Sequence, residues 1–286
     1  MKTGEKIQVV VIIFFCVVLD IVLHMVTSPY STMPDNPNLS FVANILGIEI
    51  TASLWALSAF SVVAFVFWRI RDAIPKEGVS KGLRYGTAIA LLWFLAMLEG
   101  VSLFGNPLIK EIIVGLSDAI PVFLMGVLLG LVKPEKGSGT TSVELSPKQK
   151  TKTIVLFTVI FLVGRYIAYS LGVIKSGSKT MPIQTFAWTL LMGIAIGTAF
   201  MLLGTKRKGK SVQHRAWEFG FLTFGLNWAV FLVFMPLVFS GYIVDVLLRM
   251  VIDSTLVTVA SYLTIIARED LLKVGPGTYK NATEQR

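Results

Sequence analysis

Eight long apolar runs, separated by polar breaks, constrain this chain more than any other feature. A helix needs about 20 mostly apolar residues to cross a hydrocarbon core roughly 30 Å thick. Backbone polar groups inside lipid must bond within their own segment, which excludes loose strands, and the runs do not alternate as barrel strands would. The runs cover approximately 7–27, 51–69, 84–104, 109–132, 152–173, 184–204, 216–238 and 242–266.

We therefore predict an all-α, polytopic integral membrane protein with about eight transmembrane helices. The composition agrees, since 15% of the residues are charged, 54% are hydrophobic and the mean hydropathy is +0.73. A cleaved signal peptide is an alternative for the first run because a short basic start precedes it, but no convincing small-x-small cleavage site follows. The single cysteine, Cys16, excludes a disulfide within one chain.

The positions of Lys and Arg predict the orientation, since cytoplasmic loops retain positive charge. These residues concentrate at the N-terminus, in the loops after the second, fourth and sixth runs, and in the C-terminal tail. The alternate loops hold Lys110, Lys175 and Lys179. We therefore expect a multi-pass protein of the cell membrane with both termini cytoplasmic. The formal charge of +9 then reflects topology and some attraction to anionic lipid, and it gives no argument for nucleic-acid binding.

The two halves of the chain share landmarks that indicate an internal duplication. The matches are Thr32-Met33-Pro34 with Thr180-Met181-Pro182, Trp55 with Trp188, Trp93 with Trp228, and Asp118 with Asp253. Aromatic belts and basic loops make any two polytopic halves somewhat alike, but Trp93 and Trp228 lie in mid-helix. We predict a first four-helix half at 1–132, a Gly/Ser/Thr-rich cytoplasmic linker at 133–151 and a second half at 152–286. Four helices per half make the repeats parallel, as in some transporters.

Ionisable residues inside the predicted spans are the candidate functional residues, because each costs roughly 2.5 to 3.5 kcal/mol near the bilayer centre. We expect them to line one outward-facing polar cavity that holds a small molecule or a cation, since acids outnumber arginines. The alternative is that they pair with one another as structural glue. The candidates are Asp20, Glu99, Asp118, Arg165, Asp245, Arg249 and Asp253, with Glu111 nearer the outer interface.

Spacing along the chain adds three expectations about these charges. Asp245, Arg249 and Asp253 are four residues apart, which puts them on one helix face. Asp20 and Arg165 lie at corresponding depths in the two halves and are candidates for an ion pair between them.

The third expectation concerns Pro121, which follows Asp118 in the same predicted helix. A proline has no backbone N–H and therefore frees the carbonyl of the preceding turn, which commonly kinks a span. We predict a kink beside the acid, at a point suited to a gate or a binding site.

Several motif matches carry little weight. Residues 204–211 satisfy the phosphate-loop pattern, but that motif needs a preceding strand, and here a predicted membrane helix precedes it. Residues 281–283 match a glycosylation acceptor on the cytoplasmic side. No His, Cys and carboxylate group has zinc-ligand spacing, so we expect no metal and no cofactor. The glycine pairs 126/130 and 193/197 predict close helix packing.

Our leading hypothesis is a permease of a small molecule or ion, coupled to protons or a cation through Asp118 and Asp253. One alternative is a non-catalytic membrane sensor, scaffold or assembly factor. Another is an integral membrane enzyme acting on lipid or peptide, in which the same two acids would form a carboxylate dyad. We favour the first two over an enzyme and assign no catalytic residue. The sequence identifies neither the substrate nor the oligomeric state.

Overall fold

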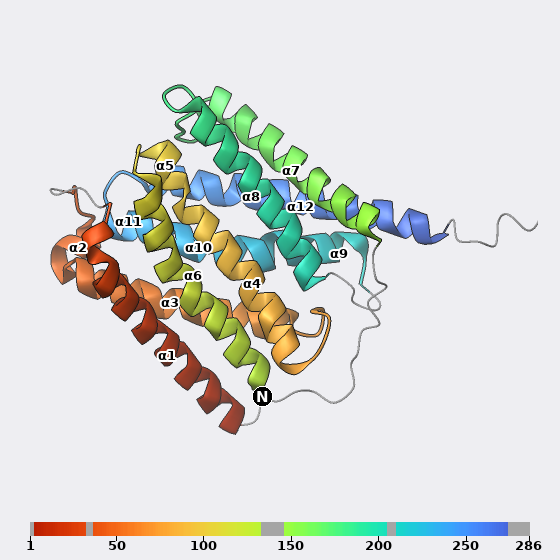
Figure 1. Ribbon diagram of the computed structural model, residues 1–286, viewed down its shortest axis with the longest axis horizontal. Helices are drawn as coiled ribbons and strands as arrows, with labels where there is room; N and C mark the ends of the chain where they lie inside the picture. The colour runs from red at the N-terminus through yellow and green to blue at the C-terminus, as the bar shows by residue number, and fades with distance from the viewer. Residues whose placement is uncertain (1–2, 33–36, 133–145, 205–209, 274–286) are drawn as a thin grey trace, which may run out of the picture.

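The computed structural model describes residues 3–32, 37–132, 146–204 and 210–273, with the side chains of 269–273 excepted. This part of the chain is all-helical apart from one isolated β-bridge between Leu39 and Phe239. Its first half contains α1 (Thr3–Thr27), η1 (Ser28–Tyr30), α2 (Phe41–Leu46), α3 (Ile48–Ile70), α4 (Gly78–Met97), α5 (Glu99–Leu103) and α6 (Leu108–Leu131) (Figure 1). Its second half contains α7 (Pro147–Ser170), α8 (Pro182–Leu203), α9 (Val212–Trp217), η2 (Glu218–Gly225), α10 (Leu226–Leu232), α11 (Phe234–Val238) and α12 (Ile243–Lys273).

Seven helical stretches within the described ranges are long and apolar enough to cross a membrane. They correspond to the first seven predicted runs, which confirms an all-helical, membrane-embedded chain. The eighth run lies in α12, a helix of 31 residues, and its crossing of the membrane stays a prediction. α7 begins at Pro147, behind a capping box formed by Ser146 and Gln149, so this helix takes in the last residues of the predicted linker.

The run predicted at 216–238 is not one regular α-helix. It passes through the π-helical segment η2 between α9 and α10. A Cβ atom added at Gly220 would lie 1.9 Å from Thr258 Oγ1, so the π-helical backbone lies directly against α12. Short π-helical segments are uncommon and often mark functional positions.

Glycines allow two helix pairs to pack with their backbones in contact. A Cβ added at Gly126 of α6 would lie 2.3 Å from Gly86 Cα of α4, and one at Gly82 would lie 2.4 Å from the Gly126 carbonyl oxygen. On α8, a Cβ at Gly193 would lie 2.7 Å from Thr158 Cα of α7. Both glycine motifs therefore make the close packing that their spacing predicts.

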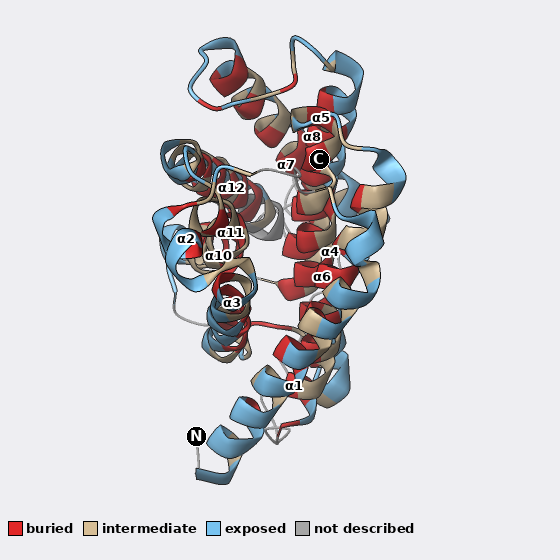
Figure 2. Cartoon of the chain, turned by 90° about the vertical axis from the view of Figure 1, so that its left-hand side faces the viewer, coloured by how far each residue is buried: buried red, intermediate tan, exposed pale blue. Residues whose placement is uncertain are grey.

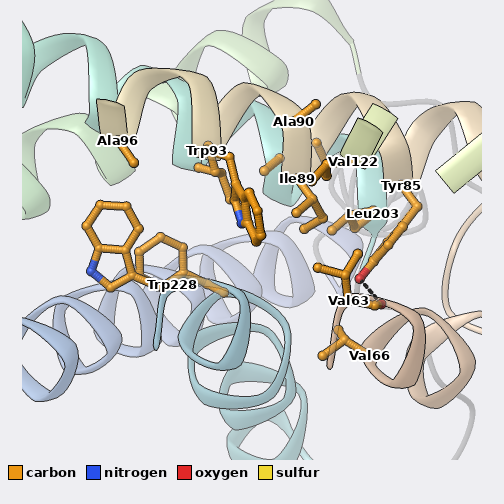
Figure 3. Close-up of a cluster of buried hydrophobic side chains, with 14 of the residues drawn as sticks. Val63, Val66, Tyr85, Ile89, Ala90, Trp93, Ala96, Val122, Leu203 and Trp228 are labelled. Atoms are coloured by element: carbon orange, nitrogen blue, oxygen red, sulfur yellow. Dashed lines mark hydrogen bonds between the residues drawn. The ribbon is translucent and has the colours of Figure 1, made fainter. Parts of the chain in front are cut away.

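Aromatic side chains fill the centre of the bundle (Figure 3). Tyr85 and Trp93 of α4 and Trp228 of α10 are buried. The Tyr85 hydroxyl donates to the Val63 carbonyl of α3 at 2.7 Å, and Trp93 makes an edge contact with Phe231 at 5.5 Å between ring centroids. This core joins helices from both halves of the chain.

Two tryptophans bond the halves together in the same manner. Trp55 Nε1 on α3 donates to the Val230 carbonyl on α10 at 2.6 Å, and Trp188 Nε1 on α8 donates to the Leu95 carbonyl on α4 at 2.7 Å. In each half, the second long helix thus bonds to the third long helix of the other half.

α1 lies at the edge of the bundle, and most of its surface is exposed (Figure 2). Its buried residues are Val9, Cys16, Val17 and Asp20. The helix packs against α3 and α6, so its inner stripe faces the bundle while its outer face suits lipid. Asp20 is the acid on that inner stripe.

The phosphate-loop match begins where a helix ends. Gly204 terminates α8 with a φ of +71°, and the Ser211 side chain caps α9. A helix therefore precedes the motif, where a nucleotide-binding loop would need a strand. Residues 205–209 and the glycosylation match at 281–283 lie outside the described residues.

Candidate functional site

Arg165 of α7 lies at the centre of a buried ion-pair network and is 0% exposed. Its Nε and Nη2 donate to the two oxygens of Asp253, each at 2.6 Å, and its Nη1 donates to Glu99 Oε1 at 3.1 Å. Trp228 Nε1 donates to the same Asp253 at 2.8 Å. A bidentate arginine–carboxylate pair is among the strongest hydrogen-bonded arrangements in proteins. We use the name arginine network for Glu99, Arg165, Asp245, Arg249 and Asp253.

Arg249 extends the arginine network along α12. Its Nη1 donates to Glu99 Oε1 at 2.5 Å, its Nε donates to Asp245 Oδ2 at 2.6 Å, and its Nη2 donates to the Lys175 carbonyl. Asp245 Oδ1 accepts the Lys175 backbone N–H at 2.6 Å. Asp245, Arg249 and Asp253 of α12 thus take part in one network, as their spacing predicts, and the network bonds α12 to α5 and to the loop after α7.

Aromatic rings surround the central arginine. The Arg165 guanidinium lies 5.1 Å from the Trp188 ring centroid and 5.4 Å from that of Phe161. The Tyr169 hydroxyl lies 3.1 Å from Arg165 Nη1. Such a buried and fully paired arrangement is strongly destabilised when one partner is removed, so the arginine network suits a role in holding helices together.

Asp20, His24 and Asp118 form a second group, which we call the acid–histidine cluster. Asp20 and His24 lie one turn apart on α1, and Asp118 lies on α6. One oxygen or ring nitrogen from each residue lies within 4.8 Å of the others. His24 Nε2 is 3.7 Å from Asp118 Oδ1, and His24 Nδ1 is 3.8 Å from Asp20 Oδ1. Both acids are 4% exposed, while the His24 side chain is 38% exposed, so the cluster opens on its histidine side.

One oxygen of Asp20 in the acid–histidine cluster, Oδ1, is buried and has no hydrogen-bond partner among the described residues. A buried polar atom left unpaired costs about 1 to 3 kcal/mol, and more when it is charged. Such an atom in a native structure calls for an explanation, and an ion is one of the standard ones.

Further polar side chains line the same face of α6. The hydroxyls of Thr27 and Ser117 are hydrogen bonded at 3.0 Å. Glu111 Oε1 accepts from Asn106 Nδ2 at 2.5 Å and from Thr32 Oγ1 at 3.2 Å. Glu111 is therefore satisfied by neutral donors.

α6 continues as one helix through Pro121, and the predicted kink stays a prediction. The proline has no N–H, so the Ser117 carbonyl lacks its usual donor within the helix. That carbonyl belongs to the residue before Asp118, which adds a further oxygen of partial negative charge to this stretch of α6.

The short helix α5 lies between the two charged groups. Glu99 accepts from both arginines of the network. The next residue, Gly100, lies against Glu111, the acid beside the acid–histidine cluster, because a Cβ added there would lie 2.5 Å from Glu111 Oε1. The candidate charges thus lie in two groups, one on each side of α5, whereas we expected them around one cavity.

Two sequence predictions about these residues are wrong. Arg165 pairs with Asp253 and Glu99 and not with Asp20. Asp118 and Asp253 contact different helices and different partners, so they form no carboxylate dyad. Depth along a helix can be counted from sequence, but the direction in which a side chain points across the bundle depends on packing.

His24 is the residue that sequence reasoning missed. No zinc-type spacing is present in the sequence, and we assigned this histidine no role. The available signal was the separation of four residues between Asp20 and His24, which puts an acid and an imidazole on one helix face inside a span. The third member, Asp118, comes from another helix and was invisible as a neighbour.

The two groups differ in their balance of charge. The arginine network holds three carboxylates and two guanidinium groups. The acid–histidine cluster and its neighbour Glu111 hold three carboxylates and one histidine. Most of the excess acid predicted for the membrane region therefore belongs to the second group.

No family model matches the chain, and no curated protein or solved structure is significantly similar to it. Function therefore has to be inferred from the chemistry of the two charged groups. The arginine network is closed, and its charged groups are satisfied by one another and by neighbouring donors and acceptors. The acid–histidine cluster is acid-rich, partly open and short of one partner.

Proposed function

We propose that this protein is a multi-pass membrane permease that moves a small cation, or moves a small solute together with one, through the acid–histidine cluster. The supporting observation is the buried pair Asp20 and Asp118, which among the described residues has no arginine to balance it and has an unpaired oxygen. Ionisable groups inside the membrane are costly and commonly mark ion or substrate pathways. A cation bound between the two acids would remove that cost.

A duplicated architecture supports this proposal. Trp55 and Trp188 match in the two halves, and each donates to a carbonyl two residues beyond the matched tryptophans Trp93 and Trp228. Reciprocal bonds of this kind fit two parallel four-helix halves related by an axis along the membrane normal, with α12 as the eighth span. Several transporter families are built from such repeats, with binding sites at the interface between them.

The proposed orientation puts the basic loops after α3 and α8 in the cytoplasm, together with both termini. α2 and α5 lie at the opposite end of the bundle from α9 and the N-terminus (Figure 1). His24 belongs to the last turn of α1, toward the α2/α5 end. The acid–histidine cluster would then open toward the outer side of the membrane.

The proposal changes the part played by Asp253. Both of its oxygens accept from Arg165, and one also accepts from Trp228. An acid held this firmly is suited to fixing the geometry of α7 and α12. Asp118 remains a proposed coupling acid, and Asp20 replaces Asp253 as the second one.

Uptake into proteoliposomes tests the function. The wild type, Asp118→Asn and the exposed-acid control Asp72→Asn, whose side chain is 60% exposed, would be compared at matched protein density. The panel would include monovalent and divalent cations and small metabolites at several external pH values. We expect at least one solute whose uptake Asp118→Asn abolishes and Asp72→Asn preserves. Equal uptake by all three inserted proteins for every solute would reject the permease and favour a sensor or scaffold.

A further inference from the structure

We infer that Asp20, His24 and Asp118 form a binding site for a divalent transition-metal ion of the Zn²⁺ or Mn²⁺ class. The inference rests on the proposed function in so far as it names the cation that this permease would carry. The metal site itself, however, is a separate claim about three side chains and can be tested without any transport.

The histidine is oriented as metal-binding histidines usually are. His24 Nδ1 lies 3.0 Å from the backbone carbonyl of Asp20, and because a carbonyl oxygen only accepts, Nδ1 is the donor in this hydrogen bond. In the neutral ring this leaves the lone pair of Nε2 free on the side of Asp118, 3.7 Å from its Oδ1. A hydrogen bond from the other ring nitrogen to a backbone carbonyl fixes the tautomer and the ring orientation of a metal ligand.

The distances leave room for an ion and are too long for direct bonds. Two ligand atoms of a tetrahedral site lie about 3.4 Å apart when the metal–ligand bonds are about 2.1 Å long. His24 Nε2 and Asp118 Oδ1 are 3.7 Å apart, and the three ligand atoms lie within 4.8 Å of one another. Small rotations of the acid side chains would shorten these distances to those of a metal site. A cation between His24 Nε2 and the Asp118 carboxylate would bind both.

Asp20 gives the independent reason to place a ligand here. It is buried, and its unpaired Oδ1 lies 3.8 Å from His24 Nδ1, while one ligand atom of each of the three residues lies within 4.8 Å of the others. A metal ion would supply the missing partner of this oxygen.

The mixed ligand set identifies the class of ion. One imidazole with two carboxylates suits Zn²⁺, Mn²⁺ and their first-row neighbours, whereas Mg²⁺ and Ca²⁺ favour sites made of oxygen alone. Three protein ligands leave at least one coordination position for water, as in sites that exchange what they bind. The partly exposed His24 side chain provides an entry path. These features fit an exchangeable ion better than a structural one.

Metal binding would be measured on protein purified without a histidine tag and placed in lipid nanodiscs. Zn²⁺ and Mn²⁺ would be titrated against a fluorescent chelator, with Mg²⁺ for comparison. We expect one Zn²⁺ per chain, with affinity lowered by about tenfold or more in His24→Gln and Asp20→Asn. The matched control is His214→Gln, which removes an exposed histidine on α9 and should leave binding unchanged.

A change of ligand chemistry separates binding from folding. In His24→Cys, Zn²⁺ should still bind and its X-ray absorption should gain one sulfur neighbour at about 2.3 Å, while Mn²⁺ binding should be lost because thiolate favours softer ions. Equal Zn²⁺ affinity in the wild type and His24→Gln, no binding by folded wild type, or no sulfur neighbour in His24→Cys would each overturn the metal site.

Uptake of Zn²⁺ and Mn²⁺ into proteoliposomes distinguishes the two proposals. Binding at the three residues without uptake of these ions or of any solute in the panel would support the metal site and reject the permease. Uptake of another cation that depends on Asp118, without metal binding, would support the permease and overturn the metal site.

Discussion

The arginine network and the acid–histidine cluster each contain a buried acid of a long helix, but they pair that acid in different ways. In each, an acid on the fourth long helix of a half meets a residue on the first long helix. Asp253 meets Arg165 and is held by a bidentate pair, whereas Asp118 meets His24 and a second acid, Asp20. The first helix thus presents a guanidinium to Asp253, which closes a bidentate pair, and an imidazole with a second carboxylate to Asp118. Replacing members of either group tests that difference.

The largest effect is expected from Arg165→Met. Removing the guanidinium leaves Asp253 and Glu99 buried without their main partner, and breaking a buried pair in this way costs about 3 to 5 kcal/mol. Most of the protein should fail to yield a monodisperse peak in detergent, and the rest should melt at lower temperature. The double change Arg165→Met with Asp253→Asn should recover part of the loss. A melting temperature unchanged in the single variant would contradict a structural role for the network.

A smaller loss of stability is expected from Gly126→Leu. This change tests whether helix packing, instead of ion pairs, positions Asp118. The first side-chain carbon would lie 2.3 Å from Gly86 Cα, so α4 and α6 would have to separate. Overpacking of this kind typically costs about 1 to 3 kcal/mol. Thermal unfolding measures it, with Leu131→Val on the exposed end of the same helix as the control. Stability equal to that of the control would show that α6 shifts freely against α4.

Trp55→Phe and Trp188→Phe should each lower the free energy of unfolding by a modest and similar amount. Each removes one hydrogen bond between the halves and leaves most of the ring packing, and such bonds within membranes average about 0.6 kcal/mol with a maximum near 1.7 kcal/mol. Chemical unfolding of both variants, alone and together, measures the two contributions. Strongly unequal losses would argue against equivalent halves.

The smallest effect on stability is expected from Asp118→Asn. The change removes one of two buried acids that lack an arginine, so the free energy of unfolding should stay within about 1 kcal/mol of the wild type or rise. Uptake and metal binding should nevertheless be lost. Thermal unfolding of Asp118→Asn and Asp253→Asn side by side measures the contrast, and an equally large loss in both would mean that both acids are structural.

The sequence was informative about the membrane helices because their signal is local. Each run of apolar residues reports its own environment, and seven of the predicted runs recur as helices of suitable length. It did not foresee the π-helical segment within 216–238, in which Gly220 lies in close contact with Thr258 on another helix.

For the candidate site, the sequence determined which residues are costly to bury, and only the tertiary structure decided which of them meet. Glu99, Asp118, Arg165, Arg249 and Asp253 are buried as predicted, because an ionisable side chain in an apolar helix is costly to expose to lipid whatever its neighbours. Their partners depend on the rotation and crossing of helices far apart in the chain. Close glycine packing and the tryptophan bonds between halves fix those rotations. That geometry assigned Arg165 to Asp253, and it left Asp20, His24 and Asp118 facing one another.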